Sequence, residues 1–441
     1  MNRTVELAGH VLEKVNDRAE AEVVVTGGAS ALTRFANSFI HQNVAEEGYA
    51  VSLRVAVDGR VNSATTTRLD NIDEFVDTTI EVASLQRVDE SWPGLTAPVD
   101  VTDPMHYDEE TAAAGPEVRA AAVAEFVAAG PDMRAAGYYE TVGQSVAFVN
   151  TAGHRAYGRY TRASLDGIQQ LNRAAGSGHA TSDRIEAIDG RGVGALAADR
   201  ARRGLDAFDV KPGEYEVVLA PECVGTIGIF LAFYGFNGKT HAEGQSFVEL
   251  GKTQLDTSVN LYDDATDPRA LGVGFDAEGT PGQRLDLVVD GVCRALAHDR
   301  RTAARAGTHS TGHGDPGSDQ WGPIPTHMFL EEGETSVEDM IASVERGLYV
   351  STFNYCRVLD PKALTVTGLT RNGTFMIENG KITGAVTNLR FTQSFVDALS
   401  QGRIHAIGND ARFADSEFGP GMLYVPSLHL ESWNFTGGAS G

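Results

Sequence analysis

One stretch near the middle of the chain, residues 214–246, constrains the fold more than any other. It begins with the β-branched residues of a strand, and Pro221 ends that strand before about fifteen mostly apolar residues. Pro221 suits the first turn of a helix, and Glu222 complements the positive end of the helix dipole. A helix that runs to Phe236 would be apolar on nearly every face, so we expect it to be buried. It is shorter than the roughly 20 residues that a bilayer-spanning helix needs.

The first half of the chain predicts an antiparallel sheet covered by helices. Hydrophobic and polar residues alternate over 51–57, and Asp58-Gly59 is typical of a hairpin turn. We expect a short strand that ends at Gly27-Gly28, and three or four strands over 133–171 with turns at Gly143-Gln144 and at residues 151–153. Helical periodicity indicates helices at three places, residues 69–84, 116–129 and 193–204.

These patterns predict an α+β fold with two domains. The N-terminal domain, residues 1–208, would hold an antiparallel sheet with helices grouped on it. The C-terminal domain, residues 209–441, would be mostly strands and loops around the one buried central helix.

Composition narrows the range of partners. The 441 residues carry a net charge of −24, from 36 basic and 60 acidic side chains. Nucleic acids and anionic membranes attract basic surfaces, so we expect neither as a partner. The three cysteines, Cys223, Cys293 and Cys356, are far apart and belong to no CxxC pattern. They predict buried free thiols in a reducing cytoplasm.

A family resemblance rests on the central helix and on a series of phrases around it. Pro221, Glu222 and Gly225 are followed by the apolar helix and then by the Gly-x-Ser-Phe run at 244–247. The N-terminal RFANSFIHQN and the later YDDATDP, GFDAEGTPGQRLDLVVDGV, AHDRRTAARAG, STGHG, NGTFMIENGKITGAV and IGNDARF occur in matching order. In these phrases the chain resembles the TldD/PmbA family of two-subunit zinc metallopeptidases over nearly its whole length.

The resemblance implies that the zinc site is missing here. In the TldD-type subunit the central helix carries HExxxH, and the same register places Ile229, Phe230 and Tyr234 at those three positions. Ile and Phe cannot ligate zinc, and Phe cannot take a proton from water. A cysteine ligand in that subunit comes from a late loop, but residues 408–428 hold neither Cys nor His. We therefore expect no catalytic residue, no metal and no cofactor in this chain.

Three polar clusters remain as candidates for a substrate groove or an interface. In the HSTGHGD segment, His309, His313 and Asp315 are residue types that can bind a metal. Ser310 and Thr311 are candidate hydroxyl nucleophiles, but no Gly-x-Ser-x-Gly elbow surrounds Ser310. We interpret the segment, with Gly312, as a loop that shapes the groove. The acids Asp263, Asp264, Asp276 and Glu278 lie in two turns, where side-chain capping of the turn is the favoured role. His241 and Glu243 are interpreted as surface residues of a turn.

The resemblance implies that this chain functions together with a second, catalytic subunit. We expect a PmbA/TldE-type subunit that packs against a zinc-bearing TldD-type subunit and helps to bind a small or unfolded peptide, and in isolation it could homodimerise. Two alternatives stay open: a stand-alone or biosynthetic amide hydrolase that uses the His309–Asp315 loop, and a non-catalytic binding protein.

Overall fold

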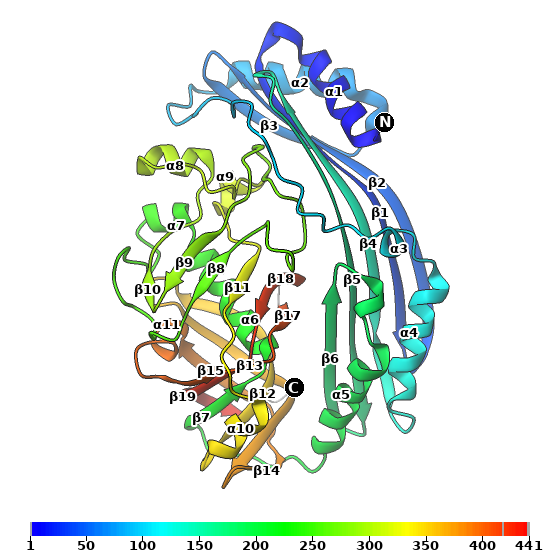
Figure 1. Ribbon diagram of the computed structural model, residues 1–441, viewed down its shortest axis with the longest axis vertical. Coiled ribbons are helices and arrows are strands. Elements are labelled where there is room, and N and C mark those ends of the chain that lie inside the picture. The colour runs from blue at the N-terminus through cyan, green and yellow to red at the C-terminus, as the bar shows by residue number, and fades with distance from the viewer. Residues whose placement is uncertain (1, 417–418, 439–441) are drawn as a thin grey trace.

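The computed structural model describes residues 2–416 and 419–438, and its N-terminal part is a long curved antiparallel sheet (Figure 1). The strand order is β3-β2-β1-β4-β5-β6. The strands are β1 Glu20–Ala36, β2 Phe39–Val57, β3 Arg60–Thr66, β4 Arg134–Asn150, β5 Arg155–Leu171 and β6 Ala174–Ser182. The helices beside them are α1 Arg3–Val15, α2 Ile72–Leu85, α3 Glu109–Ala112, α4 Pro116–Ala128 and α5 Gly190–Arg203.

Two apolar clusters attach the helices to this sheet. One joins α1 and α2 to β1, β2 and β4 through small and β-branched side chains such as Val11, Val23 and Val76. The other joins α4 and α5 to the sheet around Phe35, Phe126 and Tyr139. The predicted helices at 69–84, 116–129 and 193–204 and the turn at Asp58-Gly59 are confirmed.

Two predicted breaks in the strands are wrong. Strand β1 runs through Gly27-Gly28, and β4 runs through Gly143-Gln144, so 133–171 holds two long strands joined at 151–154. These glycines permit close approach and do not make turns. A Cβ on Gly27 would lie 2.0 Å from the ring of Tyr49, and one on Gly143 would lie 3.0 Å from Cβ of Ala112 in α3.

The C-terminal part contains two further sheets. In the larger sheet, β7, β12, β13, β15 and β19 pair in a closed ring, with β14 and β16 at its margin. The smaller sheet has the order β10-β9-β8-β11-β18-β17. The strands are β7 Gly213–Leu219, β8 Leu261–Asp263, β9 Leu285–Val289, β10 Val292–Cys293, β11 Met328–Leu330, β12 Arg346–Asp360, β13 Thr365–Glu378, β14 Lys381–Ala385, β15 Leu389–Ser394, β16 Ile404–Ile407, β17 Arg412–Ser416, β18 Gly419–Val425 and β19 Leu428–Gly438.

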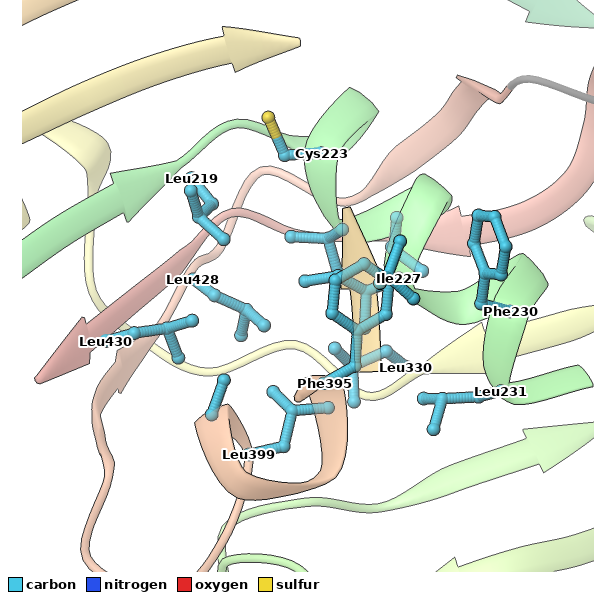
Figure 2. Packing of buried hydrophobic residues seen from close by; sticks show 14 of the residues in the cluster. Leu219, Cys223, Ile227, Phe230, Leu231, Leu330, Phe395, Leu399, Leu428 and Leu430 are labelled. Atoms are coloured by element: carbon cyan, nitrogen blue, oxygen red, sulfur yellow. The ribbon is translucent and has the colours of Figure 1, made fainter. Parts of the chain in front are cut away.

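The predicted central helix is present between these two sheets, with a changed C-terminal turn. It consists of α6, Pro221–Phe230, followed by a π-helical turn over Leu231–Gly235, so the prediction of one regular helix to Phe236 was slightly long. Every residue of α6 is buried. Figure 2 shows Ile227 among leucines from the surrounding strands, together with Phe395 of α11 and Leu399, which follows that helix. The other helices of this part are short: α7 Gly238–Ala242, α8 Arg300–Ala306, α9 Ser318–Trp321, α10 Val337–Ser343 and α11 Phe395–Ala398.

Glycines let the smaller sheet lie directly on α6. A Cβ on Gly225 would be 2.5 Å from Cβ of Ala414 in β17, and one on Gly228 would be 2.1 Å from a methyl group of Leu423 in β18. The three cysteines are buried free thiols, as the sequence predicts. Within residues 2–416 and 419–438, no helix combines the length and the apolar character required to cross a bilayer.

Replacing Gly225 by Ala should destabilise the protein by about 1–3 kcal/mol, because the added methyl group would overlap Ala414. Urea denaturation of the full chain measures the free energy of unfolding. The matched control is Gly9→Ala in α1, where nothing lies within 4 Å of an added Cβ. This control should stabilise the protein by up to about 1 kcal/mol through helix propensity. Equal effects of the two substitutions would contradict the close contact at Gly225.

Candidate functional site

A cavity of about 1130 Å³ lies at the C-terminal end of the central helix. One wall comes from α6 and its π-helical turn, another from the loop over residues 312–317, and a third from β12 and β13. It exceeds the roughly 300–1,000 Å³ typical of small-molecule sites, so it can hold a short peptide.

The three positions in register with HExxxH lie in the wall of this cavity. Ile229 and Phe230 are buried, and the Phe230 and Tyr234 rings stack with their centroids 6.1 Å apart. Phe230 also meets Phe395 edge-on at 5.9 Å. The side chains of Ile229 and Phe230 offer no lone pair to a metal, so these residues do not fit a zinc ion. The helix provides an apolar wall.

The HSTGHGD loop forms a hydrogen-bonded structure and not a ligand set. His313 is buried, with Nδ1 2.8 Å from the hydroxyl of Thr311 and Nε2 3.0 Å from Asp263. Burial disfavours the imidazolium, but the ion pair with Asp263 outweighs it and raises the pKa of His313. His309 and Asp315 are exposed, and the described residues do not gather them with His313 into a metal-sized cluster.

The hydroxyl of Thr311 is fully used in this loop. It accepts a hydrogen bond from the N–H of His298 at 2.7 Å, lies 3.1 Å from the carbonyl of the same residue and contacts His313. Ser310 donates to the same carbonyl at 3.2 Å. Neither hydroxyl lines the cavity, whereas Gly312 and His313 do. The contacts support a structural role for both hydroxyls.

Asp276 and Glu278 fix one wall of the cavity to the N-terminal sheet. Asp276 lines the cavity and accepts the N–H groups of Glu278, Thr280 and Gly314 at 2.7–2.9 Å, so it caps its turn as the sequence predicts. Burial, and then the charge of Glu278, raise the pKa of Asp276 to about 7. Glu278 lies behind the wall and contacts Arg54 of β2 at 3.1 Å.

The rim of the cavity carries a backbone irregularity at Tyr355. The register of β12 against β13 shifts between Asn354 and Arg357, and Tyr355 has a φ of +53°. A positive φ is unusual for a large side chain, and such residues gather at functional sites. Tyr355 is 64% exposed and Trp321, also on the rim, is 60% exposed. These two rings offer an accessible apolar surface next to the cavity.

A second, smaller cavity of about 210 Å³ lies at the other end of α6, against the N-terminal sheet. Glu222, buried at the start of α6, contacts Arg412 at 2.9 and 3.2 Å. Burial opposes its charge, but Arg412 and Arg200 outweigh it and lower the pKa of Glu222 to about 2. Asp166, His179 and Asp415 line the same cavity. Burial, and then the charge of Asp166, raise the pKa of Asp415 to about 6.

Sequence reasoning missed this second group of side chains. Asp166 and His179 face each other across the β5–β6 hairpin, so the turn at Asn172 could have revealed that pair. Nothing in the sequence joins them to Asp415, which lies more than two hundred residues later. The residues His241 and Glu243 lie in and just after the short helix α7, away from both cavities.

The chain belongs to the PmbA/TldD family of metallopeptidases and metallopeptidase-like proteins. The family model described as the PmbA/TldA metallopeptidase C-terminal domain matches residues 212–437, and the model of PmbA/TldA metallopeptidase domain 1 matches residues 21–83. The predicted family is therefore confirmed, and the structure confirms the predicted α+β fold class.

Individual relatives are distant. A metalloprotease TldD homolog from Buchnera aphidicola is 26% identical over 246 residues, which cover 53% of this chain and 50% of the relative. The chain spans about half the length of the curated relatives it matches first. Among solved structures, TldE from Thermococcus kodakarensis superposes with a TM-score of 0.85 at 18% identity, covering 98% of this chain and 99% of the other. A Bacteroides thetaiotaomicron protein named for a suggested role as a modulator of DNA gyrase gives 0.83 at 21% identity, covering 99% of each chain.

Replacing Glu222 by Gln should change the acid stability of the protein. The lowered pKa of Glu222 means that the carboxylate adds stability above about pH 4.5 and that this contribution is lost as the pH falls towards 2. Its size is on the order of 3 kcal/mol. The difference in free energy of unfolding between wild type and Glu222→Gln, followed by urea denaturation at several pH values, should shrink towards acid. A difference that stays constant would contradict the ion pair with Arg412.

Proposed function

We propose that this chain is the subunit without a catalytic zinc site in a two-subunit, cytoplasmic peptidase in which a TldD-type partner holds the catalytic zinc. The observation that carries the proposal is the apolar set Ile229, Phe230 and Tyr234, which lines the large cavity at the positions where the partner type has HExxxH. On this proposal the chain contributes walls and substrate contacts, and the partner contributes the hydrolytic chemistry.

The substrate class follows from the lining of the cavity. Apolar side chains such as Phe233, Ile324 and Met422 alternate with polar ones, including His313 and Arg371. Apolar walls with a few polar groups suit a short peptide with mixed side chains. The exposed rings at the rim would hold such a peptide while it enters, because aromatic rings bury a large area on contact.

In the His309–Asp315 loop, the alternative of a stand-alone hydrolase lacks a hydroxyl nucleophile that faces the large cavity. His313 lies between Thr311 and Asp263, as a general base would, but neither the Thr311 nor the Ser310 hydroxyl lines the large cavity, so neither faces a substrate bound there. The Thr311 hydroxyl also bonds to the backbone of His298.

The first test compares peptide hydrolysis by this chain alone, by its TldD-type partner alone and by the mixture. We expect the lone chain to be inactive and the mixture to cleave unfolded peptides in a chelator-sensitive manner, with co-elution of the two proteins on gel filtration. A Thr311→Val variant should support the same activity in the mixture. Hydrolysis by the lone wild-type chain that disappears in Thr311→Val would overturn the proposal.

The second test concerns the rim. Tyr355→Asn keeps a residue that tolerates a positive φ but removes the ring, so it should raise the KM of the mixture several-fold and leave kcat nearly unchanged. The control is Phe39→Asn, which removes a ring of similar exposure, 59%, that does not line the cavity. An unchanged KM in Tyr355→Asn, with intact assembly, would show that the rim does not bind substrate.

A further inference from the structure

The group Asp166, His179 and Asp415 has the composition of a metal site. Asp166 in β5 and His179 in β6 are directly paired across the two strands, and Asp415 reaches them from β17. Figure 1 shows β17 and β18 on the side of the C-terminal part that faces β5 and β6. One ligand atom from each of the three side chains lies within 4.8 Å of the others. Among the described residues, this is the one group of at least three such side chains at metal-ligand spacing.

His179 supplies an independent sign of a ligand. Its side chain is only 2% exposed, and within the described part of the chain its Nδ1 has no hydrogen-bond partner. Its Nε2 lies 2.9 Å from the hydroxyl of Thr181, which in turn lies 2.8 Å from the hydroxyl of Ser164. When Nε2–H donates to Thr181, the lone pair of the neutral ring is on Nδ1. An outer hydrogen bond of this kind is the usual way to orient a metal-binding histidine.

The position of the unpartnered Nδ1 is the decisive feature. Nδ1 of His179 lies 3.6 Å from a carboxylate oxygen of Asp166, too far for a good hydrogen bond. With Nε2–H donating to Thr181, a lone pair faces an anionic oxygen, which is repulsive unless a cation lies between them; the other tautomer places an N–H there at a poor hydrogen-bond distance. Ligand atoms around a tetrahedral zinc ion are about 3.4 Å apart, since each lies about 2.0–2.2 Å from the metal. The observed separation is therefore close to that of two ligands on one ion.

The neighbouring charged side chains Glu222 and Arg200 have partners other than the two aspartates. Glu222 lines the same cavity but is paired with Arg412. Arg200 also lines it, with its guanidinium directed to the carbonyl of Ser177 at 2.9 Å and to the hydroxyl of Tyr349. The cavity of about 210 Å³ has room for water to complete a coordination shell.

We propose that Asp166, His179 and Asp415 bind one divalent transition-metal ion, zinc or manganese, that fastens β17 to the N-terminal sheet. One imidazole and two carboxylates are ligands that both ions accept. The ion would be structural, because the site is separate from the large cavity. The proposal does not depend on the peptidase assignment. Binding of the ion would hold β17 in place, and Ala414 of this strand packs on Gly225 of the central helix.

The test uses the tag-free full chain, stripped with EDTA and dialysed against Zn²⁺ or Mn²⁺ alone. Elemental analysis should give one ion per chain, and the melting temperature should rise by a few degrees when the ion is well above its Kd. His179→Ala and the nearly isosteric Asp415→Asn should weaken binding at least tenfold and remove the thermal shift, while circular dichroism at low temperature checks that both variants are folded.

The matched control is His313→Asn, which breaks the other buried His–Asp pair and should leave the ion bound. Loss of binding only in His313→Asn would place the metal in the large cavity and overturn the proposal. Absence of a bound ion in the wild type at micromolar metal would also overturn it, leaving a simple Asp–His contact. Neither result bears on the peptidase test, because that test is read from hydrolysis by the mixture with the partner.

Discussion

The structure depends on the complete burial of one short helix between two sheets. Backbone groups within α6 bond to one another, so the helix buries this apolar segment without needing a neighbouring strand to pair its polar atoms. Its side chains lie in the main hydrophobic core, and Gly225 and Gly228 bring the smaller sheet into direct contact with its backbone. Both cavities are defined by the ends of this helix, the large one at Tyr234 and the small one at Glu222.

Strand β17 connects the helix to the rest of the molecule. Arg412 neutralises Glu222 at the start of α6, Ala414 contacts Gly225, and Asp415 points to the edge of the N-terminal sheet. Three residues of one strand therefore reach the helix terminus, the helix face and the other half of the chain. A cation held at Asp415 would act on all three contacts, which is why its effect should be seen in stability.

The sequence predicts what depends on local pattern and misses what depends on long-range contact. The buried helix, the hairpin at Asp58-Gly59 and the capping role of Asp276 follow from neighbours in the chain. The prediction of breaks at Gly27 and Gly143 is wrong because these glycines make room for Tyr49 and Ala112. In the sequence, such a glycine cannot be told from one that forms a turn. The pairing of Asp166 and His179 could be inferred from a hairpin, whereas their meeting with Asp415 required the fold.

Replacement of a metal motif by apolar residues has a physical logic in this position. Polar ligands in a buried helix are costly unless a metal or a hydrogen bond satisfies them, so a helix that holds no metal is more stable with Ile229 and Phe230 at these positions. The stacking of Phe230 with Tyr234 and its edge contact with Phe395 use the freed positions for packing. If the chain binds substrate for a partner that cleaves it, as we propose, this aromatic packing gives the cavity a wall of fixed shape.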